Sequence, residues 1–146
     1  MRAGAGRAGA GRAGAAGARA AGAAGTPRVA LAAVVGPLHV GQGVVVSRGT
    51  VLTVEAFEGT NQMLERAGKF GAKNCLFVKL AKPKQDTRFD VPVFGLQTLR
   101  AMKEAGIGNV AVETGSVLLL EKNEILKESQ KSKIGIQGIL KYKKMI

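Results

Sequence analysis

The chain has 146 residues, 46% of them apolar, which is enough for the core of one small domain. It carries 22 Lys and Arg against 10 Asp and Glu, so the formal net charge of +12 makes nucleic acid or an anionic membrane surface the first partners to weigh. The single cysteine, Cys75, excludes an internal disulfide and leaves no cysteine pair for a zinc site, and its apolar neighbours predict a buried structural thiol. No run of about twenty apolar residues is present, so no membrane-spanning helix is predicted.

The first 25 residues consist of Ala, Gly and Arg after Met1, with eight glycines and no acidic residue. Large apolar side chains that would offset the entropy of ordering are missing. This composition therefore predicts a disordered low-complexity tail over residues 1–25, followed by a folded domain over residues 26–146. An Arg- and Ala-rich start also resembles an organellar transit peptide, although serine is absent. A fusion scar or a low-complexity coding artefact fits the same composition at least as well.

The folded part is expected to begin with strands. The apolar run Arg28–Val35 fits either a short helix or a strand. Residues 39–56 contain two β-branched runs joined at Arg48 and Gly49, which predicts a β-hairpin with its turn at these two residues.

A helix is expected to begin at Thr60, a good N-cap residue, and to bury Met63, Leu64 and Ala67. The free backbone N–H groups of the first turn make a Gly-Thr helix start a natural site for a phosphate group. Most helix starts bind only their own backbone, so this signal is weak by itself.

The rest of the chain alternates between predicted strands and helices. In chain order we expect a buried strand over 75–80, a helix over 95–105 closed by Gly106, short strands over 109–113 and 116–120, a solvated helix over 121–129 and a strand over 134–140. These elements predict an α/β fold: a single small domain with a mixed sheet flanked by helices, preceded by a disordered Ala/Gly/Arg-rich tail.

Polar side chains are concentrated in the segment Lys79–Gly95, between apolar elements. This segment holds two acids, four bases and one amide around Pro83 and Pro92: Asp86, Asp90, Lys79, Lys82, Lys84, Arg88 and Gln85. Prolines favour an extended backbone, in which Asp86, Arg88 and Asp90 would leave the same face. Carboxylates suit Mg²⁺ and basic side chains suit phosphoryl oxygens, so the segment fits a metal-bound polyphosphate. Judged by spacing alone, an ordinary charged surface loop is the commoner alternative.

The segment Val78–Gly95 resembles the signature of the UDP-2,3-diacylglucosamine pyrophosphatases of the LpxI type. Between residues 39 and 140, further segments resemble this family in the same order: 41–42, 44–46, 51–52, 54–56, 58–60, 63–64, 66–68, 105–106 and 111–113. Members of this family split the pyrophosphate of UDP-2,3-diacylglucosamine with a divalent metal and release UMP and lipid X, on the route to lipid A. The resemblance implies that residues 26–146 form the C-terminal domain of such a hydrolase.

The resemblance also implies roles for individual residues. The catalytic residues would be Asp86, Asp90 and Glu58, and the ligands of Mg²⁺ or another divalent metal would be Asp86, Asp90 and Glu55. The substrate-binding residues would be Lys79, Lys82, Gln85, Arg88, Gln42, Thr60 and Asn61. In such a site water would attack phosphorus in line, a carboxylate would act as the base, and the basic side chains would stabilise the developing charge.

Three features differ from the family pattern. Asn61 stands where the family has an acid, the N-terminal domain of the two-domain family members is missing, and a Lys-rich tail replaces the usual ending. The alternative function is therefore that of a catalytically impaired fragment, which only binds the nucleotide-sugar or the lipid phosphate. A basic nucleic-acid-binding protein is a further alternative, disfavoured because aromatic residues for base stacking are few.

The expected partners follow from the implied substrate. They are UDP-2,3-diacylglucosamine, the surface of the inner membrane, and either a separate N-terminal half or a second copy of the chain. The expected location is the cytoplasm, peripheral to the inner membrane, where a basic surface favours contact with anionic lipids.

Overall fold

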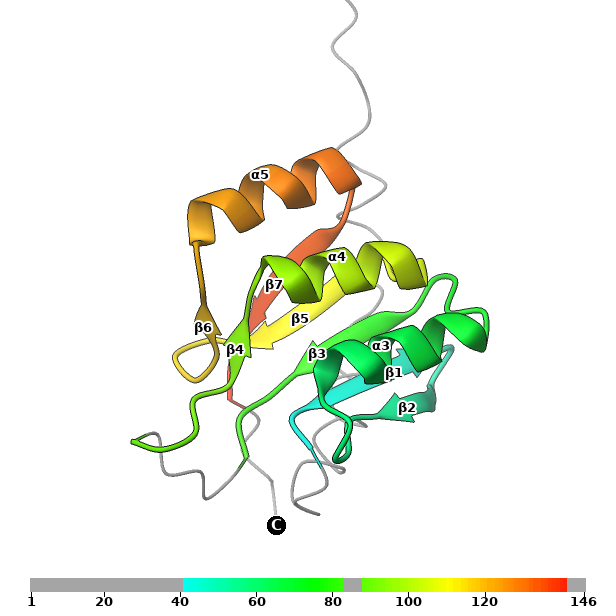
Figure 1. The fold of residues 1–146 in the computed structure, drawn as a ribbon, viewed down its shortest axis with the longest axis horizontal. Coiled ribbons are helices and arrows are strands. Elements are labelled where there is room, and N and C mark those ends of the chain that lie inside the picture. Colours follow the sequence, from blue (N-terminus) through cyan, green and yellow to red (C-terminus); the bar gives the residue numbers. More distant parts are fainter. Residues whose placement is uncertain (1–40, 83–87, 142–146) are drawn as a thin grey trace, which may run out of the picture.

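The computed structural model of the protein describes residues 41–82 and 88–141. A five-stranded sheet has the spatial order β2-β1-β3-β5-β7. Its strands are β1 (Gly43–Ser47), β2 (Thr50–Val54), β3 (Leu76–Lys79), β5 (Asn109–Glu113) and β7 (Gly135–Ile139). Within the described ranges, the helices α3 (Thr60–Lys69), α4 (Leu96–Ala105) and α5 (Lys122–Ser132) form one layer over a single face of this sheet (Figure 1). The expected α/β fold, with a mixed sheet flanked by helices, is confirmed.

The strand directions bring several chain ends to one edge of the sheet. β1 runs antiparallel to both β2 and β3, whereas β3, β5 and β7 are parallel to one another. The carboxyl ends of β2, β3, β5 and β7 therefore lie at one edge, beside the residues that lead into β1. We call this edge the carboxyl edge. Ligands of open α/β sheets usually bind outside such an edge.

Two apolar clusters hold the sheet in place. The larger cluster lies between the sheet and the helices and contains Met63 and Leu64 of α3, Phe77 of β3 and Leu99 of α4, none of them more than 1% exposed. A second buried cluster on the opposite face includes Val78 and other apolar residues of β1, β3 and β5. Because β3 contributes to both clusters, all four of its residues are buried. Burial on both faces explains the continuous apolar run in its sequence.

Most predicted elements are confirmed, with boundaries that differ by a few residues. The hairpin turn lies at Arg48 and Gly49, where both residues have positive φ. Helix α4 ends at Gly106, which adopts the left-handed conformation with φ 76°. The single cysteine, Cys75, is buried and free, as expected. No helix in the part of the chain that the structure describes has the length and apolar content needed to cross a membrane.

Two local predictions are wrong. The N-cap of α3 is Gly59 rather than Thr60, because Gly59 takes φ 84°, a value that suits glycine, and Thr60 is already helical. The strand expected over 116–120 is only the two-residue β6 (Leu118–Leu119), which pairs with β4 (Val93–Phe94) outside the main sheet. The carbonyl of Glu113 accepts the N–H groups of residues 116 and 117, and this turn carries the chain out of the main sheet.

The polar segment 79–95 also differs from the expected extended loop. Arg88 and Phe89 form a turn, so Arg88 and Asp90 do not alternate along a strand. Asp86 and Gln85 lie outside the described residues, as do the tail 1–25 and the apolar run 28–35.

Candidate functional site

Lys79 is the centre of the polar groups at the carboxyl edge. It is the last residue of β3, and only 4% of its surface is exposed. Its ammonium group donates a hydrogen bond of 2.6 Å to the hydroxyl of Thr60, the first residue of α3, and lies 3.7 Å from Oε2 of Glu55, just beyond the end of β2. The ends of two strands and the start of one helix therefore meet at this ammonium group.

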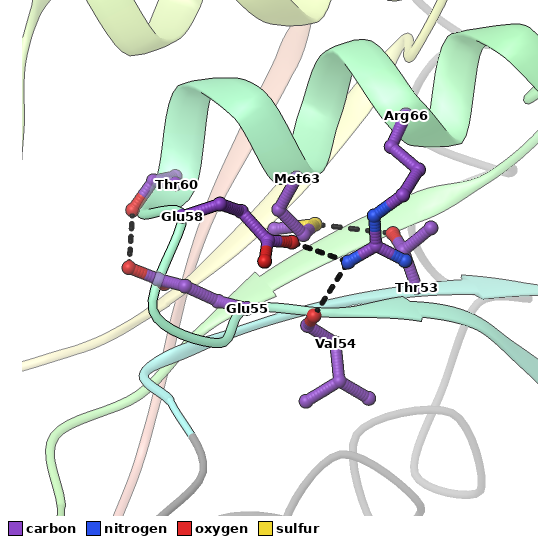
Figure 2. Close-up of polar contacts among 7 residues, drawn as sticks. All are labelled: Thr53, Val54, Glu55, Glu58, Thr60, Met63 and Arg66. Carbon is purple, nitrogen blue, oxygen red and sulfur yellow. Dashed lines mark hydrogen bonds and ion pairs between the residues drawn. The ribbon is translucent and has the colours of Figure 1, made fainter.

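The Thr60 hydroxyl links the lysine to the glutamate in a directed chain of hydrogen bonds. It accepts a hydrogen bond from Lys79. It donates one to Oε1 of Glu55 over 3.0 Å, and Figure 2 shows this second bond. An ammonium group can only donate and a carboxylate can only accept, so the direction of both bonds is fixed. The hydroxyl proton of Thr60 is thus committed to Glu55.

The charge of Lys79 depends on its carboxylate neighbours. Burial lowers the pKa of Lys79 below its ordinary value of 10.5, because the charged form loses contact with water. The negative charge of Glu55, its contact with the ammonium group and the more distant charge of Asp90 act in the opposite direction and favour the charged form. The acids of this edge therefore help to keep a buried cation available.

Two glycines make room for Glu55. A side-chain carbon at Gly43 would lie 2.7 Å from Oε2 of Glu55, and one at Gly41 would lie 1.9 Å from the Glu55 carbonyl oxygen. The backbone N–H of Glu55 also donates to the carbonyl of Gly43 over 2.8 Å. The segment leading into β1 therefore approaches Glu55 closely at both glycines.

Asp90 and Gln42 add a second pair of polar groups to the carboxyl edge. The Gln42 amide donates to Oδ2 of Asp90 over 3.3 Å, which joins the start of β1 to the loop after β3. The guanidinium of Arg88 lies 5.6 Å from the centre of the exposed Phe89 ring. Lys82 lies in the same loop and is partly buried. The structure thus brings Gln42 and Asp90 to the same edge as Lys79.

Glu58 faces another direction. Its carboxylate pairs with Arg66 of α3, and the same guanidinium donates to the carbonyl of Val54 over 3.0 Å. Figure 2 shows the Glu58 carboxylate turned toward Arg66, while that of Glu55 is turned toward Thr60. In this arrangement Glu58 fixes the loop between β2 and α3, and its predicted catalytic role stays a prediction.

The Glu58–Arg66 pair predicts a small dependence of stability on pH. Arg66 lowers the pKa of Glu58 below its ordinary value of 4.5, so the folded chain favours the carboxylate form. The resulting stabilisation is fully present above pH 4.5 and is lost as the pH falls through the folded-state value. We expect Glu58→Gln to lower the free energy of unfolding at pH 7 and to have a smaller effect in acid, as measured by urea unfolding at several pH values. In an Arg66→Gln background, the effect of Glu58→Gln on the free energy of unfolding should no longer depend on pH. If the pH dependence persists there, it does not come from the Glu58–Arg66 pair.

The start of α3 supplies backbone donors to the carboxyl edge. Gly59 makes no side-chain capping bond, and the first turn contains no acid. The first N–H groups of a helix have no partner within the helix and carry partial positive charge, which favours an anion there. Asn61 belongs to this first turn, but its side chain is exposed and lines a groove between α3 and α4.

A metal site is not complete among the described residues. In residues 41–82 and 88–141 no group of three or more His, Cys, Asp or Glu side chains is arranged to hold an ion. Asp90 presents an exposed carboxylate with an amide partner, which suits a hard cation, whereas Asp86 lies outside the described residues. Glu55, the third predicted ligand, faces an ammonium group instead. Of the predicted ligands, Asp90 therefore presents a carboxylate at the surface, and the role of Glu55 as a ligand stays a prediction.

Sequence reasoning found the residues of the carboxyl edge but missed several of their partners. It did not foresee that Arg66 binds Glu58, that Gly41 and Gly43 accommodate Glu55, or that Glu113 is buried. Among the described residues, two buried side-chain oxygens lack a hydrogen bond, namely Oε2 of Glu55 and Oε1 of Glu113. The acid-free helix start and the glycines beside Gln42 were visible in the sequence, but the pairing of residues far apart in the chain was not.

The fold and this edge define a small α/β domain whose polar site is centred on a buried lysine. The sequence model of the LpxI C-terminal domain matches residues 17–137, and the chain belongs to this family. The chain is also 32% identical, over 117 residues, to the UDP-2,3-diacylglucosamine pyrophosphatase LpxI of Caulobacter vibrioides. The alignment covers 75% of this chain but 42% of that protein, so the chain spans less than half the length of this relative. The resemblance noted in the sequence is confirmed at the level of the family.

Proposed function

We propose that the carboxyl edge binds the diphosphate of UDP-2,3-diacylglucosamine and promotes its hydrolysis to UMP and lipid X. The observation that carries this proposal is the buried Lys79 ammonium group beside the start of α3. An ammonium group beside the first N–H groups of a helix suits phosphoryl oxygens. The name of the Caulobacter vibrioides relative supports the choice of substrate.

In the proposed reaction, a water oxygen forms a bond to one phosphorus atom, and the bond from that phosphorus to the bridging oxygen breaks. The bridging oxygen leaves with the other phosphate group. The carboxylate of Asp86 or Asp90 accepts the proton of the attacking water. Lys79, together with Lys82 and Arg88, stabilises the negative charge that develops on the phosphoryl oxygens.

The proposed cofactor is Mg²⁺ or another divalent metal, held by Asp90 and Asp86. A bound divalent cation would neutralise charge on the diphosphate and favour attack on phosphorus. Gln42 orients the Asp90 carboxylate through its amide, over 3.3 Å. Gln85, Thr60 and Asn61 are proposed to complete the contacts with the substrate.

A second candidate function is binding without turnover. It is favoured by Asn61, an amide in the first turn of α3, at a position where the resemblance noted in the sequence implies an acid. In this case the chain would hold the nucleotide-sugar or the lipid phosphate and leave the pyrophosphate intact.

The proposed partners follow from the substrate. A diacylated sugar nucleotide resides in a membrane, so we propose contact with the cytoplasmic surface of the inner membrane, supported by the net charge of +12. A separate N-terminal half or a second copy of the chain is proposed to cover the part of the substrate that this domain leaves exposed.

The test is hydrolysis of radiolabelled UDP-2,3-diacylglucosamine by the full chain, with Mg²⁺ and with a chelator. We expect Mg²⁺-dependent release of UMP, and we expect Asp86→Ala to lower the rate at least about 100-fold because it removes a general base or metal ligand. Glu104→Gln, an exposed acid on α4, is the matched control and should keep the parental rate.

The outcomes separate the two candidate functions. Activity of Asp86→Ala at the parental rate would contradict the catalytic assignment. A silent parent that becomes active as Asn61→Asp would identify the missing acid as the defect. Silence of both, with retained binding of the substrate, would establish the binding function in place of hydrolysis.

A further inference from the structure

The Glu55 carboxylate contacts Thr60 and Lys79, and these two neighbours make it a poor ligand for a metal ion. Its Oε1 accepts a hydrogen bond from Thr60, and its Oε2 lies 3.7 Å from the Lys79 ammonium group. The glutamate and lysine side chains are only 13% and 5% exposed, so little water screens the two charges from each other. A divalent cation bound at Oε2 would add two positive charges next to a buried ammonium group.

We propose that Glu55 is a positioning residue that holds Lys79 and the start of α3 in place for a phosphate-bearing ligand, and that it does not bind the metal. The class of ligand rests on the proposed function. The role of Glu55 itself rests on the contacts of its carboxylate and on the space made for it.

The first argument is the number of elements that one carboxylate joins. Glu55 follows β2, Thr60 begins α3, and Lys79 ends β3. In the sheet, β1 separates β2 from β3, so no backbone hydrogen bond ties the ends of these two strands to each other. The Glu55–Thr60–Lys79 chain spans this gap at the level of the side chains. Without Glu55, the ammonium group keeps only its hydrogen bond to Thr60 and loses its tie to the end of β2.

The second argument is the free-energy cost of leaving the buried Lys79 ammonium group without a carboxylate partner. A buried ammonium group without a carboxylate partner is strongly destabilising, because it loses water and gains nothing in return. Lys79 makes contacts with Thr60 and Glu55, and only Glu55 brings a negative charge within ion-pair distance among the contacts that the structure describes. The carboxylate is held from two sides, since Oε1 accepts from Thr60 and Oε2 lies 3.7 Å from the ammonium group, as expected of a positioning group.

The experiment measures two kinds of binding separately on the full chain. Inorganic pyrophosphate, titrated by calorimetry in the presence of a chelator, reports the anion site. Mn²⁺ alone, followed by its paramagnetic signal, reports the metal site. The variants are Glu55→Gln, Glu55→Asp and Asp90→Asn, with Glu65→Gln as the matched control, since Glu65 is an exposed acid of α3 that pairs with Lys69.

We expect Glu55→Gln to weaken pyrophosphate binding at least about tenfold, because one charge-assisted contact is lost and the lysine is released. Its Mn²⁺ affinity should stay within about twofold of the parent. Glu55→Asp, which keeps the charge, should recover part of the lost anion affinity. Glu65→Gln should change neither affinity. General unfolding would lower both affinities together, so a loss of anion binding alone identifies positioning.

Three results would overturn the proposal. The first is a fall in Mn²⁺ affinity for Glu55→Gln as large as that for Asp90→Asn, which would make Glu55 a metal ligand. The second is pyrophosphate binding that Glu55→Gln leaves unchanged. The third is a parent chain that does not bind pyrophosphate. The hydrolysis assay judges the proposed function separately, because it follows turnover of the complete substrate rather than binding of the isolated anion.

Discussion

Replacing Lys79 with methionine is expected to weaken pyrophosphate binding, and any hydrolysis, by about 100-fold, since the main cation of the carboxyl edge is lost. The same change should lower the free energy of unfolding by about 3 kcal/mol, because it leaves the largely buried carboxylate of Glu55 without its ionic partner. Methionine matches the length of the lysine stem, so the packing of β3 is largely kept. Urea unfolding measures the free energy of unfolding, and calorimetry measures the affinity for pyrophosphate.

The double variant Lys79→Met with Glu55→Gln separates these two effects. It removes both buried charges, so most of the lost stability should return while the loss of anion binding remains. If the double variant is as unstable as Lys79→Met alone, the destabilisation comes from packing around β3 and not from an orphaned carboxylate. If it regains anion affinity, Lys79 is not the group that binds the phosphate.

The elements of the fold were predictable where local sequence decides the structure. The hairpin of β1 and β2 follows from two β-branched runs and a Gly turn, and α4 follows from apolar residues three apart and from Gly106. These signals depend on neighbours along the chain, and the structure confirms them. The turn at Arg88 and Phe89 was missed because proline restricts its own backbone and that of the preceding residue, but not a turn several residues away.

The sequence predicted which residues belong to the candidate site, but it did not predict which of them contact each other. Glu55 and Lys79 were both selected from the sequence, yet one was assigned to a metal and the other to the substrate. Their contact depends on β1 lying between β2 and β3, and this strand order is a property of the whole sheet. For the same reason, the pairing of Glu58 with Arg66 could not be foreseen from the sequence. Spacing along the chain cannot decide which of two nearby acids turns toward a given cation.

A side chain at Gly41, next to Gln42, is expected to have the second large effect on stability. Gly41→Ala is expected to lower the free energy of unfolding by about 2–3 kcal/mol, because the added carbon would overlap backbone atoms that cannot rotate away. This carbon would lie 1.9 Å from the carbonyl oxygen of Glu55 and 2.6 Å from its carbonyl carbon. Either the segment before β1 or the end of β2 must shift, and both movements displace Glu55 from Lys79. Anion affinity should therefore fall together with stability, in contrast to a core substitution far from the edge.

The matched control for this prediction is Gly108→Ala, at the opposite edge of the sheet. No atom lies within 4 Å of a side-chain carbon built at Gly108, and its φ is not in the left-handed range. This variant should change the free energy of unfolding by no more than about 0.5 kcal/mol and leave pyrophosphate binding intact. Equal unfolding curves for the two variants would show that the approach of Gly41 to Glu55 is looser than the structure describes. A stable Gly41→Ala chain with reduced anion affinity would instead locate the whole effect in the position of Glu55, since the carboxylate would have moved without loss of the fold.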